Sequence, residues 1–102
     1  MSGIIRRRPM ELNNIVEILK ANGFVESEKS KRRLVHPEAR DFIVELYYNE
    51  EYDEIQIGDF RNYAALPAPV ISSFTTESDD YGLRVNIALA DDSVISLFCS
   101  FE

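Results

Sequence analysis

Residues 41–59, DFIVELYYNEEYDEIQIGD, decide the fold because they contain the clearest β-hairpin in the chain. The apolar side chains of its first strand occupy every second position: Phe42, Val44, Leu46 and Tyr48. A strand places alternate residues on one face, so this pattern predicts a strand with one buried side. Residues 49–53 supply a polar turn, after which Ile55 and Ile57 resume the alternation. The segment is therefore predicted to be a hairpin that closes at Gly58.

A single amphipathic helix is predicted before this hairpin. Pro9 suits the first turn of a helix, and the following apolar residues share one helical face: Leu12, Ile15, Val16 and Leu19. Gly23 is expected to end the helix in a left-handed conformation, which would bring Leu19 against Phe24. At 102 residues the chain is long enough for one core, so we predict a basic flexible arm over residues 1–8 and a single domain over residues 9–102.

The segments on either side of the hairpin are less regular. Residues 26–33 form a charged connection or the polar start of a strand, and residues 34–36 a short strand before Pro37, which belongs at an edge or in a turn. Residues 60–66 could hold one turn of helix. Residues 70–76 are rich in β-branched and aromatic side chains, which favours a strand.

A second hairpin is predicted at the carboxyl-terminal side. Its two apolar faces are Leu83, Val85, Ile87 and Leu89 on one strand, and Ile95, Leu97, Cys99 and Phe101 on the other. These faces meet only if the loop has an odd number of residues. We therefore favour a three-residue loop over residues 91–93 and disfavour a two-residue turn. Together the elements predict an α+β fold, with one N-terminal helix packed on a mostly antiparallel, twisted sheet of five to six strands.

The charge is divided unevenly along the chain. The net charge is −7, but residues 1–40 carry nine Lys or Arg against five Glu, or +4, while residues 41–102 carry two Arg against thirteen acids, or −11. A surface of one sign can steer a partner of the opposite sign, or it can simply keep a small domain in solution. No apolar run approaches the length of a membrane helix, and we expect a cytoplasmic protein.

No complete set of catalytic or metal-binding residues is recognisable. His36 is the only imidazole, Cys99 is the only thiol, and a structural zinc site normally takes four such ligands. The four glycines stand too far apart to form a phosphate-binding loop. We therefore expect no cofactor, no metal and no catalytic residues, with Cys99 buried and His36 either structural or at the surface.

Residues 15–45, IVEILKANGFVESEKSKRRLVHPEARDFIVE, resemble the amino-terminal part of the HicA family of small toxin ribonucleases. The likeness consists of a helix, a Gly-Phe pair, a basic strand and a His-Pro pair before a β-run. Members of that family carry their catalytic histidine in a Gly-Ser-His motif, where this chain has Lys29, Ser30 and Lys31. The resemblance implies a shared passage from helix to strand, and it does not imply ribonuclease activity.

The acidic hairpin is the feature from which we predict a function. Carboxylates interleaved with tyrosines offer spaced negative charge and flat contact area to a basic protein. We predict a small non-catalytic binding protein of the immunity, inhibitor or adaptor kind. Its predicted partner-binding residues are Glu45, Tyr47, Glu50, Glu51, Tyr52, Asp53, Glu54 and Asp59. A solvated hairpin with no partner explains the same residues.

Two other functions stay open at this point. One is an RNA-binding regulator or RNA-directed nuclease, which would use the basic residues 6–8 and 29–33 together with His36. Direct nucleic-acid binding is opposed by the acidic remainder of the chain. The other is a self-associating subunit or chaperone-like dimer, formed through an exposed carboxyl-terminal edge strand.

Overall fold

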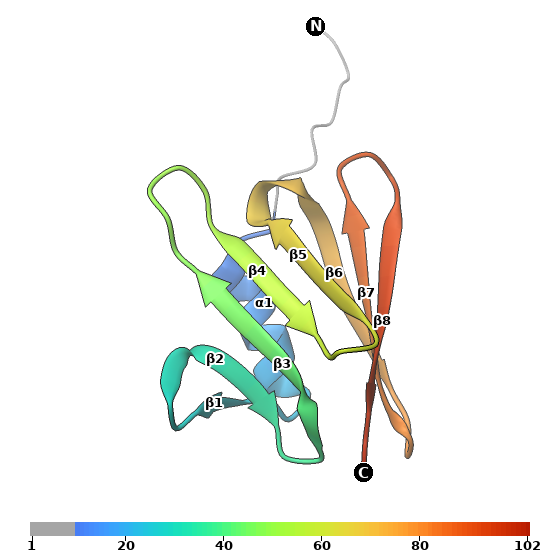
Figure 1. Cartoon of the computed structure of the whole chain (residues 1–102). Coiled ribbons are helices and arrows are strands. Elements are labelled where there is room, and N and C mark those ends of the chain that lie inside the picture. Colours follow the sequence, from blue (N-terminus) through green and yellow to red (C-terminus); the bar gives the residue numbers. More distant parts are fainter. Residues whose placement is uncertain (1–9) are drawn as a thin grey trace, which may run out of the picture.

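The computed structural model describes residues 10–102, which form one α-helix, a short 3₁₀ helix and eight strands in two antiparallel sheets (Figure 1). The α+β class, the single helix and the antiparallel pairing are confirmed. The sequence predicts one sheet of five or six strands, whereas the structure has a five-stranded sheet and a three-stranded sheet. The predicted arm over residues 1–8 lies outside the described residues. No helix in the described part is long and apolar enough to cross a membrane.

Helix α1, Leu12–Ala21, buries three of the four residues of the predicted apolar face, Leu12, Ile15 and Leu19, while Val16 is half-buried against the core. Gly23 ends it with a φ of +96°, the left-handed conformation that glycine adopts without steric cost. The Gly23 N–H donates to Lys20 O, and the Phe24 N–H donates to Leu19 O. These are the two hydrogen bonds of a Schellman motif. The prediction for the end of this helix is confirmed.

The five-stranded sheet follows the chain order from β1 to β5. Its strands are β1 (Val25–Ser27), β2 (Ser30–His36), β3 (Ala39–Tyr47), β4 (Glu54–Gly58) and β5 (Tyr63–Pro67). The charged residues 26–33 form most of the tight β1–β2 hairpin, so they are not a connection, and residues 30–33 are the polar start of a strand, the other predicted alternative. Pro37 lies in the β2–β3 turn, as predicted.

The β3–β4 hairpin has the predicted alternation. Phe42, Val44 and Leu46 are buried on β3, and Ile55 and Ile57 are buried beside them on β4. Tyr48, by contrast, lies beyond the end of β3 and is exposed. Residues 48–53 form the loop between the two strands. One face of this hairpin therefore belongs to the core, and the other faces outward.

Residues 60–66 do not contain the predicted turn of helix. Gly58 adopts a φ of +137°, and the Asp59 carboxylate accepts hydrogen bonds from the N–H groups of Arg61 and Asn62. This tight turn leads directly into β5. Because β5 is an edge strand, no further strand needs the N–H group that Pro67 lacks. A 3₁₀ helix, Ala68–Val70, then leads to the second sheet.

The second sheet consists of β6 (Ile71–Ser78), β7 (Gly82–Leu89) and β8 (Val94–Ser100), again in chain order. Its hairpin pairs the two apolar faces, as an odd loop requires, but the register differs from the prediction. Ile87 faces Ile95 because Leu89 and Ser93 close the loop, which is residues 90–92 rather than 91–93. Asp92 takes the left-handed position with a φ of 69°, and aspartate tolerates that conformation better than serine does.

Both sheets contribute to one core. Buried side chains of α1, β2–β4 and β6–β8 form a single cluster, with β8 packed on β3 and β4 and α1 in contact with β6. In Figure 1 the helix lies behind β3 and β4, so it covers the inner face of the larger sheet. The outer face of that sheet is left to solvent. β8 is an edge strand, the position that the predicted self-association requires, and that prediction is not tested by the fold.

Candidate functional site

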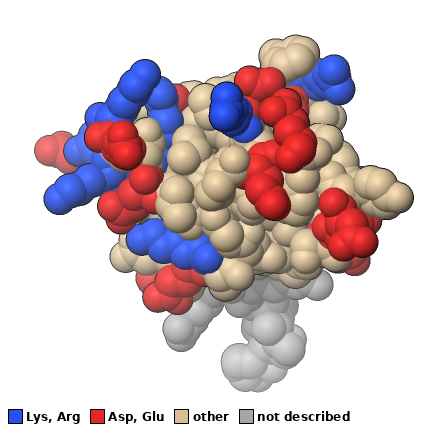
Figure 2. All heavy atoms as spheres, turned by 90° about the horizontal axis from the view of Figure 1, so that it is seen from below, with Lys and Arg blue, Asp and Glu red and all other residues tan. Residues whose placement is uncertain are grey.

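Basic side chains outnumber acidic ones in the β1–β2 hairpin, and acidic side chains predominate in the segment that follows it. Four basic residues, Lys29, Lys31, Arg32 and Arg33, belong to the β1–β2 hairpin, whereas residues 41–60 contain seven acids and no Lys or Arg. Figure 2 shows several blue side chains gathered on the left, with red ones among them, and further red side chains across the centre and the right. Residues 41–60 are thus a continuous acidic stretch, whereas the basic β1–β2 hairpin also carries Glu26 and Glu28.

The structure divides the eight predicted partner-binding residues into three groups. Glu50, Glu51 and Tyr52 are exposed in the β3–β4 loop, together with the half-buried Asp53. Asp53 anchors this loop, because its carbonyl oxygen accepts a hydrogen bond of 2.7 Å from the N–H of Ala68. No ion pair within residues 10–102 involves a carboxylate of this loop.

Glu45, Tyr47 and Glu54 form the second group, on the outer face of the sheet, where their polar atoms are already engaged. Arg33 lies 2.9 Å from Glu45 Oε1, and the Tyr47 hydroxyl donates to Glu45 Oε2 over 2.9 Å. That hydrogen bond to the carboxylate raises the pKa of Tyr47. Glu54 accepts a hydrogen bond of 3.1 Å from Gln56. Glu45 is thus compensated within the fold, unlike the loop carboxylates.

Asp59 stands apart from the other seven. It follows β4 at the end opposite the loop, and β4 is five residues long, so about 16 Å separate it from the loop carboxylates. One of its oxygens, Oδ1, holds the β4–β5 turn by accepting the N–H groups of Arg61 and Asn62 at 2.8 and 2.9 Å. The predicted residues therefore lie along the whole hairpin rather than in one cluster.

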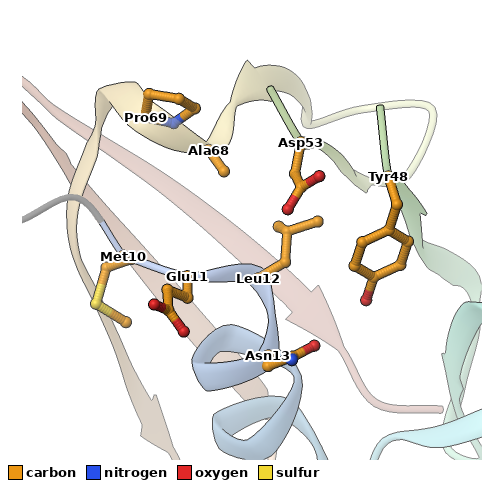
Figure 3. Close-up of a pocket in the computed structure, with 8 residues that line it drawn as sticks. All are labelled: Met10, Glu11, Leu12, Asn13, Tyr48, Asp53, Ala68 and Pro69. Atoms are coloured by element: carbon orange, nitrogen blue, oxygen red, sulfur yellow. The ribbon is translucent and has the colours of Figure 1, made fainter. Parts of the chain in front are cut away.

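A hollow of about 540 Å³ lies at the base of the acidic loop (Figure 3). Its lining comes from the start of α1, the loop and the 3₁₀ helix: Met10, Glu11, Leu12, Asn13, Tyr48, Asp53, Ala68 and Pro69. In Figure 3 the side chains of Tyr48 and Asp53 extend from the loop toward the beginning of the helix. The lining includes two carboxylates and no Lys or Arg. The hollow therefore continues the acidic character of the loop.

The outer face of the larger sheet carries a row of apolar residues that sequence reasoning did not predict. Cross-strand partners run through all five strands in one register: Val25, Val35, Ile43, Gly58 and Tyr63. A solvent-facing side of an antiparallel sheet is ordinarily polar. Tyr63 is 58% exposed, and Phe60, in the adjacent turn, is 80% exposed. Recognising this row requires the strand register, which the sequence alone does not provide.

A groove of about 530 Å³ lies along this row; we call it the outer groove. Its lining residues are Arg40, Asp41, Ile43, Glu45, Gln56, Gly58, Asp59, Phe60 and Tyr63. This lining contains three carboxylates and one basic side chain. Two of the predicted partner-binding residues, Glu45 and Asp59, thus border an aromatic groove. A partner that approaches the acidic hairpin from the outer side meets apolar surface as well as charge.

His36 and Cys99 occupy structural positions. His36 is 7% exposed, its Nδ1 accepts from the Glu38 N–H over 3.1 Å, and its Nε2 lies 3.2 Å from Asn22 O. Each ring nitrogen is therefore held by the backbone. Cys99 is fully buried, and this burial, with the nearby Asp59 charge, raises its pKa to about 12. Within residues 10–102 no three His, Cys, Asp or Glu side chains are grouped to hold a metal ion.

Comparisons with known proteins add no relative to this description. No protein-family model, no curated protein and no solved structure matches the chain.

Proposed function

We propose that this protein is a non-catalytic binding module of the immunity, inhibitor or adaptor kind, which engages a basic protein through its β3–β4 hairpin. The observation that carries the proposal is the uncompensated charge of the loop. Glu50 and Glu51 are exposed beside Tyr52, and no ion pair of the described residues reaches them. The hollow below them adds Glu11 and Asp53.

Exposed carboxylates of this kind act mainly on the rate of association. Their field attracts a basic surface over a distance set by the Debye length, about 8 Å at physiological ionic strength. Each exposed ion pair in the final complex adds only about 0–1 kcal/mol. The expected signature is therefore a fast association that slows as salt rises, with a smaller effect on dissociation.

The test begins by identifying the partner. The tagged protein is used to capture proteins from its native cells at low salt, and those eluted by high salt are identified. Association and dissociation rates are then measured for the purified pair between low and high ionic strength. Glu50→Lys combined with Glu51→Lys should slow association about tenfold or more at low salt.

The matched control reverses two acids of the β6–β7 hairpin. Glu77→Lys combined with Asp80→Lys makes the same change in net charge, and both residues are exposed. This control should slow association much less than the loop variant does. An affinity that does not change with salt concentration would contradict the proposal. So would equal effects of the two double variants on the rate of association.

RNA binding is a second candidate, supported by the basic β1–β2 hairpin, where Lys29, Lys31 and Arg32 are exposed. Lysine and arginine side chains gathered on one hairpin attract phosphate groups and release counterions on binding. A gel-shift assay with total RNA at low salt tests this candidate, with Lys31→Glu combined with Arg32→Glu as the variant. Absence of a shift for the wild-type protein would eliminate it.

A further inference from the structure

The proposed function explains how a basic partner is attracted, but it does not explain what would hold the partner in place. Exposed ion pairs are screened by salt and contribute little to affinity. Stable interfaces instead depend on a few aromatic or other large side chains that become fully desolvated at the centre of the contact. The outer groove, beside the acidic hairpin, offers two such side chains in addition to the exposed Tyr48 and Tyr52 of the loop: Phe60 and Tyr63.

The floor of the groove is a gap in the apolar row. Gly58 stands between Ile43 and Tyr63 in the register, and it presents no side chain. A Cβ atom at this position would lie 2.0 Å from Asn62 O, so the β4–β5 turn requires glycine here. The gap is consequently a fixed property of the turn. Its sides are formed by Ile43, Tyr63 and the exposed ring of Phe60.

Carboxylate oxygens remain free at the rim. Asp59 uses only Oδ1 to hold the turn, and within residues 10–102 no hydrogen bond engages its Oδ2. The Asp41 carboxylate makes no ion pair with any described residue. Glu45, in contrast, is engaged by Arg33 and Tyr47. The negative charge available to a ligand is therefore at the Phe60 end of the groove.

The aromatic ring at that end already interacts with a cation. The guanidinium carbon of Arg61 lies 5.3 Å from the centre of the Phe60 ring, within the range of a cation–π contact. A ring and two carboxylates in one place suit a side chain that combines an aliphatic stem with a cationic head. Arginine and lysine have this construction.

We infer that the outer groove is the anchor site of the interface and takes an arginine or lysine side chain of the basic partner. This inference rests on the proposed function. The aliphatic stem lies over Gly58 between Ile43 and Tyr63, and the cationic head reaches Asp41 and Asp59 beside the Phe60 ring. The acidic loop then sets the rate of association, while the groove sets the lifetime of the complex.

A second copy of this chain fits the groove less well. The chain carries a net charge of −7, so two copies repel one another unless a basic segment of one meets an acidic segment of the other. Of the three carboxylates in the groove lining, Glu45 is paired with Arg33, whereas Asp41 and Asp59 make no ion pair with any described residue. These two carboxylates favour a basic ligand from a different protein.

The first experiment uses defined probes in place of the unidentified partner. A synthetic peptide of four Arg-Leu-Ala repeats is titrated into the isotope-labelled protein, and the amide resonances are followed by NMR. Shifts should concentrate at Ile43, Gly58 and Tyr63. A peptide of four Glu-Leu-Ala repeats should produce none. No binding of the arginine peptide, equal binding of both peptides, or shifts confined to other faces would each overturn the inference.

The second experiment uses a pair of matched variants. Phe60→Ala should weaken binding of the arginine peptide about tenfold or more, because it removes one side of the groove. Tyr81→Ala is the control, since Tyr81 is 79% exposed in the β6–β7 turn and Phe60 is 80% exposed. Asp41→Asn, which keeps the shape and removes one charge, should also weaken binding. Equal effects of Phe60→Ala and Tyr81→Ala would overturn the inference.

The outcomes separate this inference from the proposed function. If reversal of Glu50 and Glu51 slows partner association while Phe60→Ala leaves the affinity unchanged, the proposed function stands and the anchor site is wrong. If neither variant changes binding to the partner, both are wrong. If light scattering finds a dimer that Phe60→Ala dissociates, the groove binds a second copy, and this inference is overturned.

Discussion

The imidazole of His36 stacks on the ring of Phe101, with ring centroids 4.7 Å apart and an angle of 22° between the planes. Phe24 meets the same imidazole edge-on at 5.2 Å. Backbone groups of Asn22 and Glu38 engage the two ring nitrogens. His36, the only histidine in the sequence, therefore connects the end of α1, the β2–β3 turn and the segment after β8.

Replacing this imidazole should affect stability. His36→Ala removes two hydrogen bonds and two ring contacts and leaves a cavity, so we expect the free energy of unfolding to fall by about 2–4 kcal/mol. Urea denaturation followed by circular dichroism measures the change. Lys31→Ala, at an exposed position of the same strand, should change it by less than about 0.5 kcal/mol. A His36→Ala variant as stable as this control would refute the structural role.

Gly23 should be sensitive to substitution for two separate reasons. Its φ of +96° disfavours any residue with a side chain, and a Cβ atom would lie 2.8 Å from His36 Nε2. Gly23→Ala should therefore lower the free energy of unfolding by at least about 1–2 kcal/mol. The steric part of this loss disappears when His36 is also replaced by alanine. The free energy of unfolding of the double variant should therefore fall by less than the sum of the decreases in the two single variants. Strict additivity would show that the close approach to His36 has no effect.

The buried thiol of Cys99 should make the protein less stable at alkaline pH. Its folded-state pKa is raised to about 12 from the ordinary value of 9.0, chiefly by desolvation. Between these values the unfolded chain releases the thiol proton and the folded chain retains it. Stability is therefore full below pH 9 and falls as the pH rises, by about 1.4 kcal/mol at pH 10. Urea denaturation at pH 8 and pH 10 measures this, and Cys99→Ala should show a smaller decrease. Identical decreases would assign the effect to other groups.

Glu45 and the loop carboxylates should respond differently to neutralisation. Glu45→Gln breaks the contact with Arg33, so it should lower the free energy of unfolding by about 1 kcal/mol while leaving the rate of partner association nearly unchanged. Glu50→Gln combined with Glu51→Gln should slow association and leave stability within about 0.5 kcal/mol. Stopped-flow kinetics and urea denaturation provide the two measurements. If Glu45→Gln slows association more than the loop variant does, the assignment of Glu45 to internal compensation is wrong.

The parts of the fold that the sequence predicts are those with strong local signals. The alternation from Phe42 to Leu46 and the spacing from Leu12 to Leu19 each determine an element and its buried face. Gly23 identifies the helix end, because few other residues adopt its conformation. The apolar faces of the second hairpin also predict that its loop has an odd number of residues. Its register, however, depends on whether residue 92 or 93 takes the left-handed position.

The features that sequence reasoning missed depend on contacts between distant residues. The β1–β2 hairpin consists mainly of charged residues, so it shows little alternation between polar and apolar positions. The separation into two sheets arises at residues 68–70, where a 3₁₀ helix interrupts the succession of strands. The outer groove brings Ile43, Gly58 and Tyr63 together only through the pairing of β3, β4 and β5. Residues 63–67, YAALP, are apolar throughout and show no alternation, so the sequence carries no clear signal for β5.

The two faces of the β3–β4 hairpin make this molecule a convenient starting point for engineering. Inward residues such as Val44 and Ile57 hold the core, while their immediate neighbours Ile43 and Gln56 point outward. A display library that randomises only the outward positions would sample new specificities without repacking the interior. Selection from such a library for new targets would show how widely this sheet surface can be reprogrammed.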